Sequence, residues 1–296
     1  MFTIPPQFVA DTIQREGENG RKWLAELPQK VKSLCADWQL TLDGQPMHGY
    51  FGLVLPVRRR NIPCVLKVTW INKTTTLEPI ALAAWNGEGA VKLLDHNATA
   101  GALLLERLNQ QHSLNDLPIE EAIPLSATLL ARLAIPNPPA AIPSQQAMVA
   151  DIINSLHTRW QQYGQSIPAK VIHATHDLAQ QYGPTSGHRL VNYDLHYLNV
   201  LASQREPWLA VDPKVVLGDP EFGFAQLLFC RLEDIEANGG LDHHFNSIIK
   251  HAQLNEELAW AWTIVRCVDY WLWALSMGFT EDPVRCEKIV NWLLKT

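Results

Sequence analysis

The pattern of apolar residues changes near residue 107, and this change restricts the folds open to the 296-residue chain. Ahead of it, one helical segment at 77–85 lies among β-rich runs at 50–57, 62–70, 91–95 and 101–108, and another helical segment precedes them at 23–38. Beyond it the periodicity is mostly helical, at 125–133, 147–163, 171–182, 254–277 and 284–294. A chain of this length and pattern is expected to form two domains of different content.

The composition excludes some classes of protein. The 24 Lys and Arg residues against 30 Asp and Glu residues leave a net charge of −6, which argues against nucleic acid and suits a cationic small ligand. No long apolar run indicates a membrane span, and the first residues lack the order of a signal peptide. The five cysteines are scattered without metal-ligand spacing, as is typical of free thiols in a reducing compartment. We therefore expect a cytoplasmic protein that binds neither membrane nor nucleic acid.

Two acids and an amide lie at short spacing within residues 192–214. Asp194 lies five residues before Asn199, and Asp212 lies thirteen residues after Asn199 at the end of an apolar run. Phosphoryl transfer from a nucleotide uses such a set. One carboxylate orients the attacking hydroxyl and takes its proton, while an amide oxygen and a second carboxylate hold Mg²⁺. Asp194 and Asn199 alone would be typical of a turn, whereas the addition of Asp212 at this spacing favours a catalytic site.

Several motifs, taken in order, resemble those of the aminoglycoside and hydroxyurea antibiotic resistance kinases, the family of the streptomycin 6-kinases. They are Cys64-Val65-Leu66-Lys67-Val68, the helix with Glu78 and Trp85, residues 87–94, 101–108, 194–201 and 206–214, and Gly218-Asp219-Pro220. The resemblance implies an α+β, two-lobed, protein-kinase-like fold. A small antiparallel-sheet lobe at residues 1–105 would bind nucleotide, and a mostly helical lobe at 106–296 would carry out catalysis and bind the acceptor.

For the nucleotide, the resemblance implies that Lys67 contacts the α- and β-phosphates of ATP and that Glu78 holds Lys67 through an ion pair. The backbone around Glu106 would bind adenine. Lys67 and Glu78 also have structural interpretations. Lys67 could be a strand-end lysine that reaches water, although its apolar neighbours and the adjacent hairpin favour function. Glu78 precedes Pro79 at a predicted helix start, where a carboxylate often interacts only with the helix dipole.

For the chemistry, the resemblance implies that Asp194 is the base and that Asn199 and Asp212 are the ligands of Mg²⁺. His196 lies among apolar neighbours and is expected to be a structural, hydrogen-bonded histidine. The segment at residues 48–52 only loosely resembles the glycine-rich loop of kinases and is not a P-loop, so phosphate binding is not inferred from it.

Two departures from the family pattern lie beside the catalytic motif. Asn192-Tyr193 stands where the family usually has His-Gly, and Gly223 stands where it usually has an acid. The family histidine braces the catalytic loop; Asn192 can still form hydrogen bonds, while Tyr193 adds bulk. We expect weaker support of the loop, which lowers activity without abolishing it. We also expect the Tyr193 ring to pack under the loop.

The acceptor site is expected after the metal-binding motif, where six acids and a single base, Arg231, lie within residues 219–242. A solvent-exposed acidic helix explains most of these acids, but Glu233 and Asp234 could bind a polycationic aminoglycoside. Asp269 is a further candidate, because it lies in the apolar stretch 262–273, where a buried acid needs a partner. The alternative for Asp269 is a structural pair with Arg266, three residues earlier on the same helix face.

The residues and the resemblance together predict a phosphotransferase that depends on ATP and Mg²⁺ and acts on a hydroxyl group of a cationic small molecule, such as a streptomycin-like aminoglycoside. Fold likeness alone does not settle the substrate. Two alternatives therefore stay open. One is a kinase of a metabolite with no role in resistance, and the other is a nucleotide-binding pseudokinase that serves as a scaffold.

Overall fold

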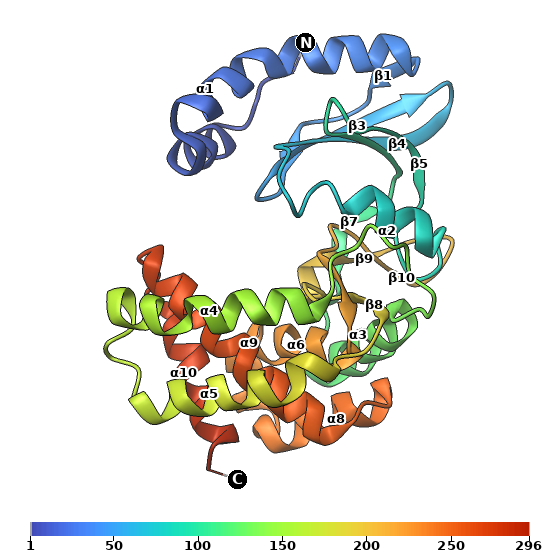
Figure 1. Ribbon diagram of the computed structural model, residues 1–296. Coiled ribbons are helices and arrows are strands. Elements are labelled where there is room, and N and C mark those ends of the chain that lie inside the picture. The colour runs from blue at the N-terminus through green and yellow to red at the C-terminus, as the bar shows by residue number, and fades with distance from the viewer. Residues whose placement is uncertain (1, 296) are drawn as a thin grey trace. The chain divides into compact units, whose positions relative to one another are not determined.

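The computed structural model describes residues 2–295, which divide into two compact units (Figure 1). The N-terminal unit ends at Asn109, and the C-terminal unit begins at Gln110. The change of pattern near residue 107 thus lies at the boundary between the units.

An antiparallel sheet forms the centre of the N-terminal unit. Its strands are β1 (Leu40–Leu42), β2 (Met47–His48), β3 (Gly52–Arg59), β4 (Ile62–Thr69), β5 (Leu93–Asn97) and β6 (Ala102–Glu106). They follow the order β1-β3-β4-β6-β5, with β2 beside β3, and every pair is antiparallel. Helix α2 (Glu78–Trp85) lies between β4 and β5 in the chain. The predicted order of strand, strand, helix, strand, strand is confirmed.

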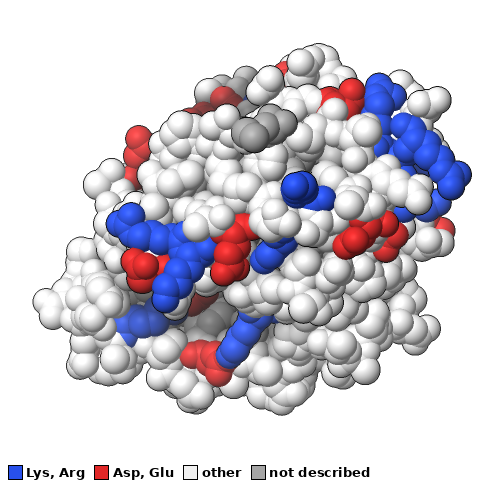
Figure 2. Space-filling view, turned by 90° about the horizontal axis from the view of Figure 1, so that it is seen from above, with Lys and Arg blue, Asp and Glu red and all other residues white. Residues whose placement is uncertain are grey.

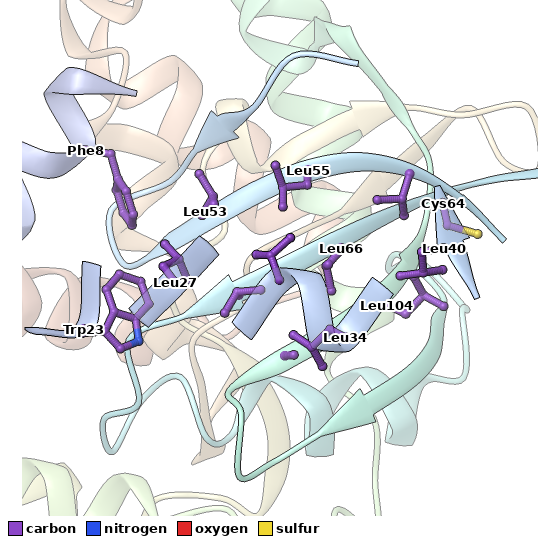
Figure 3. Close-up of a cluster of buried hydrophobic side chains, with 14 of the residues drawn as sticks. Phe8, Trp23, Leu27, Leu34, Leu40, Leu53, Leu55, Cys64, Leu66 and Leu104 are labelled. Carbon is purple, nitrogen blue, oxygen red and sulfur yellow. The ribbon is translucent and has the colours of Figure 1, made fainter. Parts of the chain in front are cut away.

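One long helix, α1 (Pro6–Asp37), packs on this sheet and starts far ahead of the predicted segment at 23–38. Gly17 interrupts its helical geometry, with φ 58° and ψ −133°, a conformation that glycine adopts without a steric penalty. Apolar side chains of α1 and of the sheet form one buried cluster (Figure 3), which includes Phe8, Trp23, Leu27 and Leu34 from the helix and Leu53, Leu55, Leu66 and Leu104 from the strands. The helix therefore supplies the apolar cover for one face of the sheet.

The C-terminal unit is mostly helical. Its helices are α3 (Ile119–Leu133), α4 (Gln145–Tyr163), α5 (Ala169–Tyr182), α6 (Ala225–Phe229), α7 (Leu232–Ala237), α8 (Gly240–Ala252), α9 (Glu256–Ser276) and α10 (Glu281–Leu293). Helices α4, α5 and α9 pack against one another (Figure 1), and α9 also packs on α10. Two small sheets hold the catalytic motif. In one, β8 (Arg189–Asn192) pairs antiparallel with β11 (Val215–Gly218). In the other, β9 (Val200–Ala202) lies between β7 (Asn109–Ser113) and β10 (Trp208–Ala210) and pairs antiparallel with β10.

Basic and acidic side chains are interspersed on the face seen in Figure 2. In the N-terminal unit, Asp43 forms salt bridges with both Arg58 and Arg107, at 2.9 and 2.7 Å. These two arginines hold the pKa of Asp43 below its usual value, with the hydrogen bond from Arg107 as the largest cause. Within residues 2–295, no helix is both long and apolar enough to cross a membrane.

The packing of α1 on the sheet generates a stability prediction. Leu27 is fully buried in the cluster, so Leu27→Ala removes apolar contacts and leaves a cavity. We expect a loss of about 2–5 kcal/mol in the free energy of unfolding, measured by denaturation in urea. Glu26→Ala, at an exposed position of the same helix, is the matched control and should change stability by less than about 0.5 kcal/mol. Equal stability of the two variants would show that α1 is not part of the core.

Candidate active site

The catalytic motif owes its geometry to two strand pairings. In the hairpin of β9 and β10, Val200 pairs with Ala210, and the amide of Val211 donates a hydrogen bond of 2.8 Å to the carbonyl of Asn199. In the other pairing, Asn192 at the end of β8 faces Val215 at the start of β11, and the Tyr193 amide donates to the Lys214 carbonyl at 2.9 Å. Asn199 and Asp212 thus lie at one end of the hairpin, and Asp194 lies beside Lys214.

Both carboxylate oxygens of Asp194 have partners. Lys214 Nζ lies 2.8 Å from Oδ2, and Gln226 Nε2 donates to Oδ1 at 3.0 Å. The Asp194 amide donates to Asn192 Oδ1 at 3.1 Å, so the turn that carries the acid is fixed from within. The Asp194 side chain keeps 15% of its accessible surface, and this exposure leaves it within reach of a ligand.

Asn199 and Asp212 offer oxygen ligands of the kind that Mg²⁺ prefers. Asn199 uses Nδ2 for a weak contact of 3.5 Å with the Asp194 carbonyl, and a metal would be bound by the other atom of the amide, Oδ1. Asp212 has φ 49°, a left-handed conformation that Asp tolerates better than most residues. The described residues contain no group of three or more His, Cys, Asp or Glu that could hold a metal. One amide oxygen and one carboxylate fit Mg²⁺ that takes its other ligands from phosphates and water.

Burial also affects the pKa values of His196 and Lys214, which lie near Asp194 and Asp212. It lowers the pKa of His196, although Asp194 opposes this shift, and the imidazole is therefore neutral near pH 7. For Lys214, burial acts to lower the pKa, but the charge and the hydrogen bond of Asp194 outweigh it and the pKa is raised. Lys214 is thus a permanent cation beside Asp194 at neutral pH.

Lys67 and Glu78 form a buried ion pair within the N-terminal unit. Lys67 Nζ lies 2.8 and 2.7 Å from the two carboxylate oxygens of Glu78, and only 8% and 3% of the two side chains are exposed. Glu78 is also the first residue of α2. The sequence offered an ion pair and a helix start as alternative roles of Glu78, and in the structure it has both. A buried pair of this kind contributes little net stability because both charges lose water, and its presence favours a functional role.

Glu106, the expected adenine contact, ends β6. Its carboxylate accepts a hydrogen bond of 2.7 Å from the Lys92 amide, while its own amide donates to the Lys92 carbonyl at 3.0 Å. The Glu106 side chain is thus tied to the segment before β5.

The turn between β2 and β3 is held by α1, which the sequence did not indicate. Arg15 Nη1 donates to the Tyr50 carbonyl at 2.9 Å, and its guanidinium lies over the rings of Tyr50 and Phe51, 4.6 and 4.7 Å from their centres. A Cβ added at Gly52 would lie 2.9 Å from Thr69 and 3.5 Å from Lys67 Cε. Glycine at position 52 therefore allows this turn to approach the strand that carries Lys67.

The two departures from the family pattern lie together under the catalytic loop. The Tyr193 ring packs edge-on against Phe222 at 6.2 Å, and the Arg266 guanidinium lies over it at 4.9 Å. Burial raises the pKa of the Tyr193 phenol. A Cβ at Gly223 would lie 2.6 Å from the Asn192 carbonyl oxygen and 2.7 Å from Leu130, so the backbone leaves no room for an acid at this position. Close packing of the backbone thus takes the place of a side chain at position 223.

The candidate acceptor residues are each paired with an arginine. Glu233 accepts from Arg285 at 2.7 Å, and Asp234 pairs with Arg231 at 2.7 Å. Two of the six acids within residues 219–242, Asp219 and Glu221, are buried. Asp219 accepts a hydrogen bond from Trp262 Nε1 at 2.9 Å, and Glu221 accepts one from the Asn255 amide at 2.7 Å.

The expected burial of Asp269 and its alternative pairing with Arg266 were both wrong, while its role as an acceptor contact stays a prediction. Its side chain is 31% exposed, and it pairs with Arg159 of α4, at 2.5 Å, in place of Arg266. Arg266 instead donates to the Tyr193 carbonyl at 3.0 Å. The packing of α4 on α9 brings Arg159 to Asp269, and this tertiary contact leaves no trace in the spacing of residues along α9.

A sequence model of the aminoglycoside/hydroxyurea antibiotic resistance kinase family matches residues 37–278. Streptomycin 6-kinase of Streptomyces griseus is 34% identical over 286 residues, or 93% of this chain and 92% of that protein. Hydroxyurea phosphotransferase of Kitasatospora aureofaciens is 32% identical over 295 residues, or 98% of this chain and 86% of that protein. A solved aminoglycoside phosphotransferase, in ternary complex with ADP and hygromycin B, is similar with a TM-score of 0.62 at 16% identity, over 88% of this chain and 97% of that chain. The expected α+β, protein-kinase-like fold is confirmed.

The packing of Tyr193 leads to a second prediction. Tyr193→Ala removes the ring that contacts both Phe222 and Arg266, and we expect it to reduce the free energy of unfolding by about 3 kcal/mol. Tyr193→Phe is the matched control, since it keeps the ring and should leave stability nearly unchanged. Thermal unfolding followed by circular dichroism compares the two variants. If Tyr193→Phe is as unstable as Tyr193→Ala, the hydroxyl group and not the ring supports the loop.

Proposed function

Because this chain belongs to the aminoglycoside/hydroxyurea antibiotic resistance kinase family, we propose that it transfers the γ-phosphoryl group of ATP to a hydroxyl group of an aminoglycoside. One observation carries this proposal. A single short segment places a partly exposed carboxylate, Asp194, next to two oxygen donors, Asn199 and Asp212, at the end of a hairpin. Phosphoryl transfer needs little beyond positioned groups and neutralised charge.

Each unit contributes separate groups to the reaction. In the N-terminal unit, Lys67 binds the α- and β-phosphates, Glu78 keeps the Lys67 ammonium in place, and the backbone near Glu106 binds adenine. In the C-terminal unit, Asn199 and Asp212 hold Mg²⁺. The metal, when bound with nucleotide, neutralises charge on the phosphates.

Asp194 acts as the base. It orients the acceptor hydroxyl and receives its proton while the hydroxyl oxygen bonds to the γ-phosphorus and the bond from that phosphorus to ADP breaks. The amide of Gln226 and the turn at Asn192 keep the carboxylate in position for this step.

The relatives support an aminoglycoside as the acceptor, and the net charge of −6 suits a cationic one. Glu233, Asp234 and Asp269 are the candidate contacts, and the amino groups of the acceptor would have to exchange with the arginines that now pair with them. Hydroxyurea is the second candidate, because a small uncharged acceptor needs no exchange with these arginines and the hydroxyurea phosphotransferase covers nearly the whole chain.

Release of ADP by the purified protein tests the function. Streptomycin, hygromycin B and hydroxyurea, each added with ATP and Mg²⁺, form the panel. Faster ADP release with an aminoglycoside supports the proposal, whereas a response to hydroxyurea alone favours the second candidate. Nucleotide binding without ADP release under any condition would instead indicate a pseudokinase.

The role of Asp194 predicts the effect of its substitution. Asp194→Asn keeps the shape of the side chain but cannot take a proton, so the turnover of the responsive acceptor should fall by about 10²–10⁴-fold. Nucleotide affinity should stay within a few-fold of the wild type. Asp177→Asn, on the exposed face of α5, is the matched control and should keep full turnover. Wild-type turnover of Asp194→Asn would remove Asp194 from the mechanism.

The proposed metal ligands predict a change in the Mg²⁺ requirement. Chelation of divalent ions should stop ADP release, and added Mg²⁺ should restore it. Asn199→Ala and Asp212→Asn should each raise the Mg²⁺ concentration that gives half-maximal turnover, because each variant weakens one protein ligand. A titration of Mg²⁺ at saturating ATP measures this shift. An unchanged titration curve in both variants would place the metal elsewhere.

A further inference from the structure

Asp194, the base of the proposed reaction, already has a side-chain partner on each of its carboxylate oxygens. Lys214 Nζ binds Asp194 Oδ2 at 2.8 Å, and Gln226 Nε2 binds Oδ1 at 3.0 Å. A hydroxyl group that is to lose its proton to Asp194 needs one of these oxygens. Each oxygen keeps a second lone pair that can accept from the hydroxyl, but the proton that Asp194 then receives removes its negative charge and, with it, the attraction that holds a charged partner.

Lys214 is the partner that can leave. Its side chain is 38% exposed and ends a flexible stem of four carbons, so the ammonium can change position at little cost. Gln226 belongs to α6, whose residues Ala225, Leu227 and Leu228 are buried in the core, and its Oε1 also contacts Cys230 Sγ. The amide is thus fixed by its helix, while the lysine is fixed only at its backbone, next to β11.

The ion pair is not explained by stability. A pair in which one side chain is more than a third exposed contributes little to stability, because water screens the two charges. A permanent cation two residues after Asp212 is, however, well placed for chemistry, because transfer of a phosphoryl group gathers negative charge on its oxygens.

We propose that Lys214 is a second catalytic residue, whose ammonium group leaves Asp194 for the transferring phosphoryl group as the carboxylate takes the proton of the acceptor hydroxyl. This inference rests on the proposed phosphotransferase function. In the step, the hydroxyl oxygen bonds to the γ-phosphorus, the bond from that phosphorus to ADP breaks, and the hydroxyl proton goes to Asp194. Lys214 keeps its three protons and only donates hydrogen bonds to the phosphoryl oxygens.

The test compares Lys214→Ala, Lys214→Arg and a matched control. Lys288 forms an ion pair of similar length, 2.7 Å, with Glu236 on the surface, so Lys288→Ala removes the same kind of side chain away from the catalytic loop. Turnover of the responsive acceptor should fall by about 10²–10³-fold in Lys214→Ala, with the KM for the acceptor nearly unchanged. Lys214→Arg keeps a cation and should recover part of the loss, and Lys288→Ala should keep wild-type turnover.

A binding measurement separates catalysis from support of the loop. ADP with aluminium fluoride mimics the transferring phosphoryl group and needs no turnover. Its affinity should fall in Lys214→Ala by a factor similar to that for turnover, while the affinity for ADP alone and the thermal midpoint stay near the wild type. An unchanged affinity for the mimic, or a turnover that stays constant or rises in Lys214→Ala, would overturn the proposal.

Failure of the proposed function gives a different result. In that case the wild-type protein itself transfers no phosphoryl group to any acceptor, and both ideas fall together. An active wild type with active Lys214 variants refutes the role of Lys214 alone.

Discussion

The antiparallel pairing of β8 with β11 is the constraint on which the candidate active site depends. Asn192 faces Val215 in this pairing, and the bond from the Tyr193 amide to the Lys214 carbonyl extends it by one step. Since the two strands lie more than twenty residues apart in the chain, the loop between them is closed at its base. A change of register by one residue would turn Lys214 away from Asp194. The rest of the loop is then shaped by the β9–β10 hairpin, which places Asn199 beside Val211.

Buried apolar side chains of the C-terminal unit pack against this strand pair. Val191 and Val216 of the two strands pack in one buried cluster with Phe222 and Trp262, and the Tyr193 ring is added at its edge. Gly223 lets the backbone approach the Asn192 carbonyl, which a larger residue would prevent. The departures from the family pattern therefore act together: the tyrosine fills space beside Phe222, and the glycine brings the chain close to the loop. Support of the loop has a different form here and is not simply missing.

Much of the fold could be predicted because its signals are local. The β-rich runs, the turn chemistry and the helical periods of α4, α5 and α9 lie within single segments, and the strands and helices were found there. The first half of α1 was missed, since Gly17 and Gly20 and several charged residues interrupt its periodicity. Helices α6 and α8 were missed, because α6 is very short and Gly239-Gly240 suggests a loop ahead of α8, whereas α7 corresponds to the acidic helix considered for residues 219–242.

The partners of individual side chains were less predictable. The pair of Lys67 with Glu78 followed from a known motif, but Asp269 found Arg159 on another helix, and Arg15 reached Tyr50 from a helix ahead of the family match. Lys214 belongs to the motif at residues 206–214, yet its contact with Asp194 depends on strand register, which spacing along the chain does not reveal.

Identification of the product tests phosphoryl transfer by this protein most directly. The protein is incubated with ATP, Mg²⁺ and streptomycin, and the antibiotic is then examined by mass spectrometry, with Asp194→Asn as the reference. The antibiotic should gain the mass of one phosphoryl group with the wild type and not with the variant. Recovery of streptomycin and of every other aminoglycoside without a phosphoryl group, whether ATP is consumed or only bound, would contradict the proposed function.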